Sequence, residues 1–163
     1  MQGIHGAVEQ AVLRFLVRIG WHEGAFLTLR KQMTGGPARG FVQMEAPAAM
    51  DAIDCGRQKQ WLDWIGTATG TTKAALIAAR KELDPDEPSY PAKNKIGELL
   101  ETDNLFGLCL ARSYLAREPT AIPAGLKEQG DYWETHWHRK SNPAGKKQFV
   151  ENGRRLNALL KWD

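Results

Sequence analysis

The amino-acid sequence predicts an all-α domain of about six to seven helices. Apolar residues recur at steps of three and four along most of the 163-residue chain, which is the period of a helix face. No segment shows, over more than a few residues, the strict alternation of a half-buried strand. Clusters of glycine and proline separate the periodic segments. The length is that of one ordinary domain, so we expect residues 1–163 to form a single unit.

The composition excludes several classes of protein. Hydrophobic residues make up 42% and charged residues 25% of the chain, values that argue against both a disordered chain and a membrane protein. The net charge is only +3 and no dense run of Lys and Arg occurs, so we expect no nucleic-acid partner. No apolar run approaches the roughly 18 residues of a membrane span, and the N-terminus lacks a signal-peptide pattern. We therefore expect neither a span nor a secretory signal.

The first periodic segment covers residues 7–32 and predicts one long helix, with Gly20 and Gly24 as weak points. Residues 34–40 contain three glycines and a proline, which predicts a loop or a tight turn. The next helices are expected at residues 44–53, 59–65 and 73–83. Pro47 is tolerated in the first turn of its helix, and Thr71 or Thr72 is placed to cap the alanine-rich helix that follows.

The second half of the chain begins after a segment with three prolines, residues 84–92, which ends the preceding helix. The remaining helices are expected at residues 97–116, 126–139 and 146–160. Residues 97–116 are the most apolar, so we place this helix at the centre of the core. In the last helix one face is formed by Phe149, Val150, Gly153, Leu156 and Leu160.

The sequence gives no sign of a metal or cofactor site. His22-Glu23 lacks the second histidine of a zinc-protease motif, because position 26 is phenylalanine. His136 and His138 are two residues apart and point to different sides of a helix, whereas Glu134 and His138 are spaced as a surface pair. Cys109 lies in an apolar helical pattern typical of a buried free thiol, so we expect no disulfide with Cys55. We expect no cofactor and no metal.

Glu23 is the main clue to function. Val12, Leu16 and Ile19 precede it at helical steps, and Phe26 and Leu27 continue the same face, so Glu23 lies on the apolar stripe. An isolated charge is costly to bury. The carboxyl group must therefore be paired, neutral, or at the floor of a cleft.

Two interpretations of Glu23 remain open from the residues alone. It is either a structural glutamate, paired with Arg30 or Arg39, or a general acid/base whose pKa is raised by an apolar setting. Cleavage of a glycosidic bond needs a proton on the leaving oxygen, which a half-buried glutamate supplies near neutral pH. Aromatic side chains suit a sugar-binding cleft. Five tryptophans are available for one, and we expect at least half of them to be core residues instead. The five are Trp21, Trp61, Trp64, Trp133 and Trp137.

A resemblance to known families enters at these residues. Glu23 followed by Gly40-Phe41-Val42-Gln43-Met44 resembles the lysozyme-like lytic transglycosylases and goose-type lysozymes. More closely, three segments are similar to a family of small phage proteins of the same kind. These are LTLRKQMTGGPARGFVQMEAPAAMDAI, LCLARSYLAREPTAIP and GDYWETHWHRKSNPAGKKQFVENG, which follow one another in the expected order.

The resemblance implies a lysozyme-like helical fold, a peptidoglycan glycan strand as substrate, and a place in a phage particle beside other virion proteins. Glu23 would be the general acid/base and Gln43 and Met44 would line the sugar subsites. Gly40 would allow close approach of the chain. Tyr114 stands nearest to the Tyr-Asn-Ala-Gly segment of the transglycosylases, and Trp21 is the aromatic residue beside the acid. These proteins need one catalytic carboxylate, because the 6-hydroxyl of the muramoyl residue attacks internally, and no second carboxylate stands out here.

The chain also departs from the transglycosylase pattern. Gly24 follows the glutamate where those enzymes commonly have serine, and Glu45 fits only the phage proteins. The alternative is therefore a catalytically inactive structural virion protein, and a third possibility is a sugar-binding adaptor. An open cleft with Glu23 at its floor would favour the enzyme, whereas Glu23 held by Arg30 or Arg39 would favour the structural protein.

Overall fold

The computed structural model describes residues 2–24, 31 and 36–162. Within these ranges the chain forms helices and no β-strand, so the prediction of an all-α fold is confirmed. The first five helices are α1 (Gln2–Glu23), α2 (Ala46–Gln58), α3 (Leu62–Thr69), α4 (Lys73–Lys81) and α5 (Lys95–Thr102). The others are α6 (Asn104–Leu115), α7 (Leu126–Tyr132), the π-helix η1 (Trp133–His138) and α8 (Pro143–Leu160). No helix in these ranges has the length and apolarity needed to cross a bilayer.

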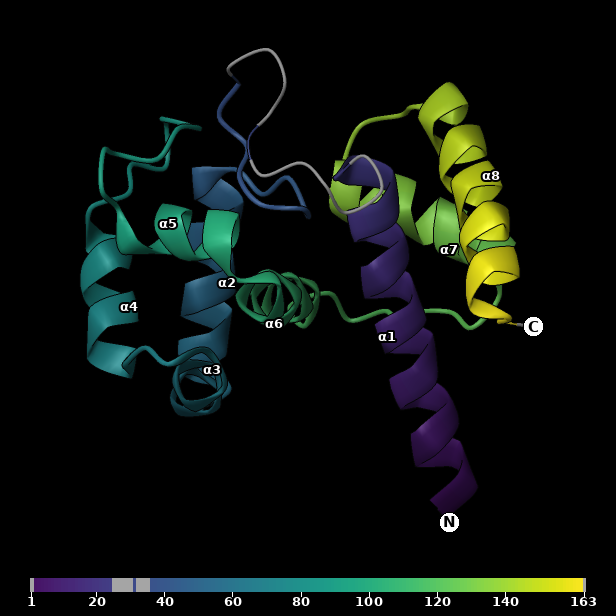
Figure 1. The fold of residues 1–163 in the computed structure, drawn as a ribbon, viewed down its shortest axis with the longest axis horizontal. Helices are drawn as coiled ribbons and strands as arrows, with labels where there is room; N and C mark the ends of the chain where they lie inside the picture. Colours follow the sequence, from purple (N-terminus) through teal and green to yellow (C-terminus); the bar gives the residue numbers. More distant parts are fainter. Residues whose placement is uncertain (1, 25–30, 32–35, 163) are drawn as a thin grey trace.

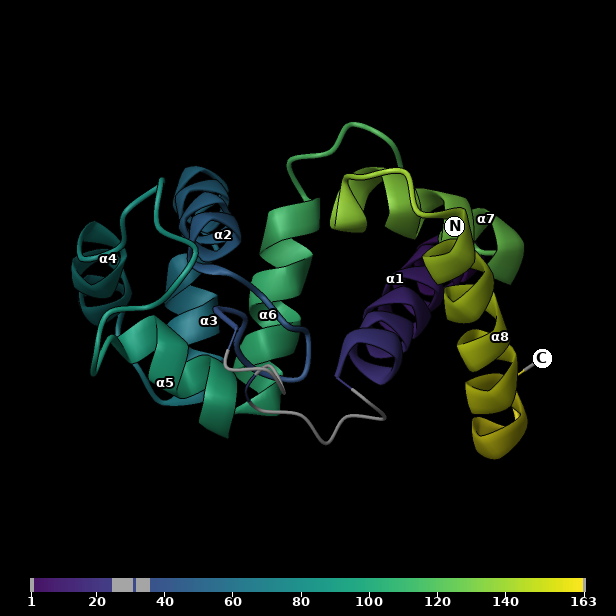
Figure 2. The same cartoon turned by 90° about the horizontal axis from the view of Figure 1, so that it is seen from above.

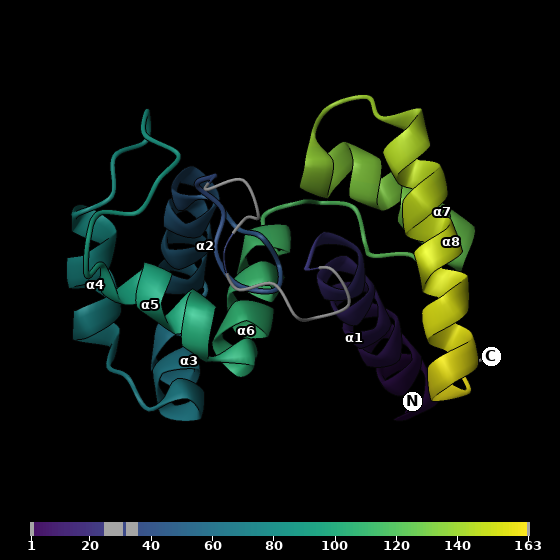
Figure 3. The same ribbon diagram turned by 45° about the horizontal axis from the view of Figure 1, so that its top comes forward.

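The helices fall into two groups on either side of α6 (Figures 1 and 2). Helices α2 to α5 form one group, and α1, α7 and α8 form the other. Helix α6 contacts α2, α3 and α5 on one side and α1 on the other. Its buried residues include Phe106, Leu110 and Tyr114, so the expected central position of this part of the chain is confirmed. Figure 3 shows α1 beside α8 with the two termini on the same side.

Several predicted helix boundaries are confirmed because local capping sets them. Pro47 lies in the first turn of α2, where its missing N–H is not needed. The Thr72 side chain accepts a hydrogen bond of 3.1 Å from the N–H of Ala75 and begins α4. Helix α3 begins at Leu62, later than predicted, because Gln60 takes a left-handed conformation with φ 59°.

The prediction of one helix over residues 97–116 is wrong. Asp103 leaves the helical conformation, with φ −126° and ψ 106°, and separates α5 from α6. Its carboxylate accepts hydrogen bonds of 2.8 and 3.1 Å from the N–H groups of Leu105 and Phe106. An aspartate that caps a new helix competes with continuation of the old one. The apolar periodicity on both sides hides this break.

The ends of the other long segments also differ from prediction. Helix α1 ends at Glu23, and most of the predicted continuation to residue 32 lies outside the described residues. Helix α8 begins at Pro143, because the side chain of Asn142 accepts a 2.9 Å hydrogen bond from the N–H of Gly145. Leu160 was placed on the buried face of this helix, but its exposed fraction is 47%, since the helix ends beyond the core.

A buried arginine joins α1 to α7 and α8. Arg18 donates to Gln129 at 2.5 Å and to Asn157 at 2.7 Å. Gln129 in turn donates to the carbonyl oxygens of Ala11, at 3.2 Å, and Pro123, at 2.7 Å. Burial lowers the pKa of Arg18 to about 10, a cost that the hydrogen bonds offset. This network fixes the position of α1 and hence of Glu23 at its end.

Candidate functional site

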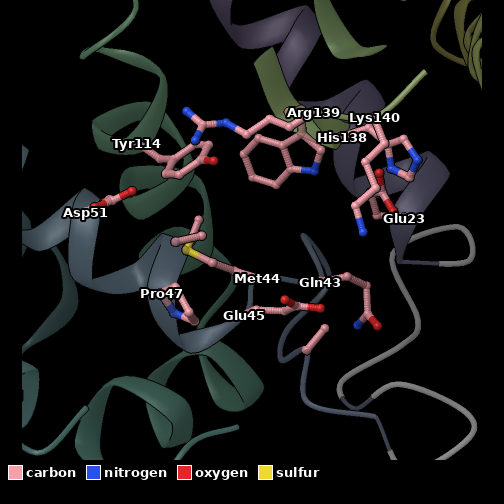
Figure 4. Close-up of a pocket in the computed structure, with 13 residues that line it drawn as sticks. Glu23, Gln43, Met44, Glu45, Pro47, Asp51, Tyr114, His138, Arg139 and Lys140 are labelled. Carbon is pink, nitrogen blue, oxygen red and sulfur yellow. The ribbon is translucent and has the colours of Figure 1, made fainter. Parts of the chain in front are cut away.

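A cleft of about 700 Å³ lies between the two groups of helices (Figure 4). The end of α1 and the residues at the end of η1 form one side, which we call the Glu23 side. The turn of residues 38–45 and the start of α2 form the opposite side, which we call the turn side. The lining residues are Glu23, Ala38, Gln43, Met44, Glu45, Pro47, Ala48, Asp51, Tyr114, Trp137, His138, Arg139 and Lys140.

Glu23 occupies the Glu23 side as a half-buried carboxyl group. The indole Nε1–H of Trp133 donates to its Oε1 at 2.8 Å. Burial raises the pKa of Glu23 to about 7, and the hydrogen bond from Trp133 opposes this rise. A carboxyl with this pKa exchanges its proton near neutral pH, as a general acid/base requires.

An aromatic layer lies behind Glu23 and shields that side of the carboxyl group from water. Trp133, only 2% exposed, stacks between His138 and Phe149, with ring centroids 5.0 and 5.5 Å away. The edge of His22 meets Trp133 at 4.9 Å, and its Nδ1 accepts a 3.2 Å hydrogen bond from Asn152. Burial, together with repulsion from His138, lowers the pKa of His22 to about 4, so this imidazole is neutral at pH 7. The side of Glu23 that faces this layer is therefore apolar.

The π-helix η1 determines which side chains reach the cleft. It replaces the end of the helix predicted over residues 126–139, and π-helical turns often occur at functional sites. Trp133 at its start points to Glu23, whereas Trp137 and His138 at its end line the cleft. Glu134 and His138, the predicted surface pair, interact electrostatically, but the close contacts of Glu134 are with other residues. Glu134 instead accepts a 2.8 Å bond from the N–H of Asn142 and pairs with Lys146 at 2.9 Å.

Hydrogen bonds to its own backbone fix the conformation of the turn side. Arg39 and Met44 exchange two N–H···O bonds of 3.0 Å, and Gln43 has a left-handed φ of 50°. The Gln43 amide donates to the carbonyl oxygen of Gly40 at 2.6 Å. Gly40 itself has φ 71°, and a Cβ atom there would lie 2.5 Å from the carbonyl oxygen of Leu100. Only glycine fits this position without strain.

The far end of the cleft is charged. The Tyr114 ring contacts the guanidinium groups of Arg117, 3.9 Å from the ring centroid, and Arg139, at 5.2 Å. Arg117 pairs with Asp51, and Arg139 pairs with Glu118 at 3.0 Å. Burial raises the pKa of Tyr114, so its hydroxyl keeps its proton at neutral pH.

The structure brings four of the six predicted site residues to the cleft, namely Glu23, Gln43, Met44 and Tyr114. Gly40 does not line it, since its close approach is to Leu100 rather than to the cavity. Trp21 does not line it either, and the aromatic group beside the acid is Trp133. Among the other tryptophans, Trp61 and Trp137 pack against the core and Trp64 is 59% exposed.

The proposed structural partner of Glu23 is engaged elsewhere. Arg39 pairs with Glu101 at 2.9 Å and donates to the carbonyl oxygens of the preceding residues. Arg30, the other proposed partner, lies outside the described residues. Glu23 thus lines an open cleft with a hydrogen-bond donor beside it and without Arg39.

Sequence reasoning missed several cleft residues. Glu45 and Asp51 bring further carboxylates to the turn side, and Arg139 and Lys140 bring cations from beyond η1. Trp133 is 110 residues from Glu23, and no local pattern links the two. The signal that was available is the density of aromatic and basic residues in 132–140, although helical spacing alone gave no reason to assign them to one cleft.

Neither cysteine lines the cleft. Cys55 and Cys109 are buried free thiols. In the part of the chain that the structure describes, no three His, Cys, Asp or Glu side chains gather closely enough to hold a metal ion.

No protein-family model, curated protein or solved structure matches the chain. The cleft combines three properties that bear on its function. They are a carboxyl with a raised pKa, an aromatic layer behind it, and a polar side opposite it.

Proposed function

We propose that the chain is a virion-associated protein that cleaves peptidoglycan, of the lytic transglycosylase type, with Glu23 as general acid/base. It acts on the cell wall of the host during delivery of the phage genome. The observation that carries the catalytic part is the carboxyl of Glu23, which lines the cleft with a pKa of about 7. The phage context comes from the resemblance of the three sequence segments described above.

The mechanism uses one carboxyl group twice. Protonated Glu23 donates its proton to the glycosidic oxygen while the bond from this oxygen to C1 of the muramoyl residue breaks. The 6-hydroxyl oxygen of the same residue then bonds to C1, and its proton passes to the Glu23 carboxylate. The products are a 1,6-anhydro sugar and a free hydroxyl on the departing strand. Glu23 ends protonated as it began, which suits a pKa near the working pH.

The glycine after Glu23 is compatible with this role. A side chain at position 24 would collide with the carbonyl oxygen of Phe41, so the serine of the transglycosylases has no room here. The indole N–H of Trp133 supplies a hydrogen bond to the carboxyl in its place. The departure from the family pattern therefore leaves Glu23 with a donor that orients it.

The dimensions of the cleft support a saccharide ligand. A volume of about 700 Å³ is in the usual range for ligand sites and is open along one side. Trp137, half-buried at the cleft, offers an aromatic ring, and such rings stack on the apolar faces of sugars. Gln43 offers an amide on the opposite side.

The test is mass analysis of the fragments that the protein releases from purified peptidoglycan, beside the variant Glu23→Gln. We expect anhydro-muropeptides from the parent and a loss of about 10²–10⁴-fold in the variant. Gln keeps an oxygen acceptor for Trp133, so the fold is expected to persist. Glu9→Gln, on an exposed part of α1, is the matched control.

Other outcomes assign the alternatives. Fragments with reducing ends would indicate hydrolysis by water instead of internal attack. Tight binding to glycan strands without release, unchanged by Glu23→Gln, would indicate a sugar-binding adaptor. Neither binding nor release by the folded parent would favour a structural virion protein.

A further inference from the structure

Two opposite charges in the cleft form no ion pair with the residues that the structure describes. Lys140 reaches the cleft from beyond η1, and Glu45 lines the turn side (Figure 4). Both residues are exposed, and among the described residues neither forms an ion pair. The other charges at the far end are paired, Asp51 with Arg117 and Arg139 with Glu118. Lys140 and Glu45 are therefore the two charges that remain available to a ligand.

Glu45 begins α2 without using its side chain as a cap. It is the N-cap residue of α2, with φ −85° and ψ 160°, but its side chain makes no capping hydrogen bond. Only the backbone carbonyl oxygen of Glu45 takes part in the helix, because it accepts a 3.1 Å hydrogen bond from the N–H of Ala49. An N-cap carboxylate normally bonds to the first turn. This one is left facing the cleft.

The position of Lys140 is fixed by the turn after η1. Arg139 has a left-handed φ of 57°, and its N–H donates to the carbonyl oxygen of Glu134 at 3.0 Å. The Glu134 carboxylate then holds the N–H of Asn142 at 2.8 Å. A non-glycine residue in this conformation is costly and tends to occur at functional sites. The turn places the ammonium group of Lys140 over the cleft on the side of Glu23 (Figure 4).

The sugars of peptidoglycan do not account for these charges. The N-acetylated sugars present hydroxyls and amides, and the lactyl carboxyl of a muramoyl residue that bears its peptide is itself bonded as an amide. The peptide that peptidoglycan carries on its muramoyl residue presents free carboxylates and a free amine. A cation and a carboxylate on opposite sides of a cleft complement such a zwitterionic chain.

We propose that the cleft selects glycan strands that bear their stem peptide, with Lys140 pairing with a peptide carboxylate and Glu45 with the peptide amine. This inference rests on the proposed function, because it concerns the same substrate. It adds a specificity element that the acid and the aromatic rings do not provide. Strands stripped of peptide are accordingly poor ligands.

Binding tests the inference separately from turnover. The protein carries Glu23→Gln, and the ligands are soluble glycan fragments with stem peptides and the same fragments after removal of the peptides by an amidase. The stripped fragments keep one lactyl carboxylate on each muramoyl residue but lose the peptide amine and the peptide carboxylates. Intrinsic fluorescence follows the titration, since Trp137 lines the cleft. We expect about fivefold or more tighter binding of the peptide-bearing fragments, weakening as salt is raised. Lys140→Met and Glu45→Gln should each reduce this preference, whereas exposed Lys147→Met should not.

Equal affinity for the two ligands, or binding of neither, would overturn the inference. The inference would also be overturned if Lys140→Met and Glu45→Gln both left the preference for peptide-bearing fragments unchanged. Fragment release by the parent protein is measured in parallel and tests the proposed function by itself. If the parent releases fragments but both ligands bind with equal affinity, the proposed peptide site is wrong and the proposed enzyme stands. If peptide-bearing fragments bind more tightly but no fragments are released, the peptide site stands and the proposed enzyme is wrong.

Discussion

The two sides of the cleft are built on different physical principles. On the Glu23 side, one carboxyl lies against Trp133 and His138, and burial raises its pKa to about 7. On the turn side, Gln43 bonds to its own backbone and Glu45 stays exposed to solvent. A low-dielectric setting changes the chemistry of a group, whereas an exposed group keeps its charge for a ligand. The comparison assigns proton transfer to the first side and recognition to the second.

The largest effect is expected where the two sides touch. Gly24 lies against the carbonyl oxygen of Phe41, which leads into the turn side. Gly24→Ala should therefore destabilise the protein by about 2–4 kcal/mol, because backbone atoms have to move to admit the methyl group. Chemical denaturation measures the loss. An unchanged free energy of unfolding would show that the sides are not fixed against each other at this point.

Gly70→Ala is a contrasting variant for that experiment. Gly70 has φ 65° but no heavy atom within 4 Å of an added Cβ. Its substitution should cost about 1–2 kcal/mol from backbone conformation alone. The two variants thus compare the cost of a steric contact with backbone oxygens, at Gly24, with the cost of a left-handed backbone, at Gly70.

The second prediction concerns the burial of the Glu23 carboxyl group. The folded pKa of about 7 lies above the ordinary value of 4.5, so the folded protein holds this proton more tightly than the unfolded chain. The resulting stabilisation is complete below about pH 4.5 and is lost as the pH rises through 7. Glu23→Gln lacks this loss, so relative to the parent it should gain about 1–3 kcal/mol between pH 4.5 and pH 8.

Denaturation of both proteins across this pH range provides the measurement. His22, whose pKa is lowered to about 4, destabilises both proteins as the pH falls from 6.5, and its contribution cancels in the difference. A constant difference between the two curves would mean that Glu23 is hydrated. The Glu23 side would then be no different from the turn side.

The smallest effect is expected at Gln43 on the turn side. Gln43→Gly and Gln43→Ala both remove the amide, but only glycine is relaxed at φ 50°. The alanine variant should be about 1 kcal/mol less stable than the glycine variant. Both should weaken substrate engagement to the same degree, measured as a rise in KM. If KM instead rises more in the less stable alanine variant than in the glycine variant, Gln43 serves the fold rather than the ligand.

The sequence was informative where one local pattern determines one local structure. The apolar stripe of Val12, Leu16 and Ile19 placed Glu23 on the inner face of α1. Thr72 and Pro47 marked helix starts, because capping depends on residues close in the chain. Period alone, however, could not show that Asp103 ends one helix and begins another.

The rest of the site depends on contacts between distant residues. Trp133 contacts Glu23 although the two residues are 110 positions apart in the sequence. The π-helical turn that orients Trp133 has no pattern of apolar residues that distinguishes it from an α-helix in the sequence. Gly40 was assigned to the ligand, although it serves the approach of Leu100. Glu45 and Asp51 reach the cleft only because α2 borders it, so no second carboxylate was expected. The position of an acid can be predicted from its own helix, but the position of its neighbours requires the fold.

The most direct measurement of the central claim is the pKa of Glu23 itself. Carbon-13 NMR of protein labelled at the glutamate carboxyl groups follows each titration, and Glu23→Gln identifies the resonance by its disappearance. The account predicts a midpoint near pH 7, moving higher in Trp133→Phe because the hydrogen bond that opposes the rise is removed. A midpoint near the ordinary value of 4.5 would contradict it, since Glu23 would then be an ionised carboxylate with no proton to donate at neutral pH.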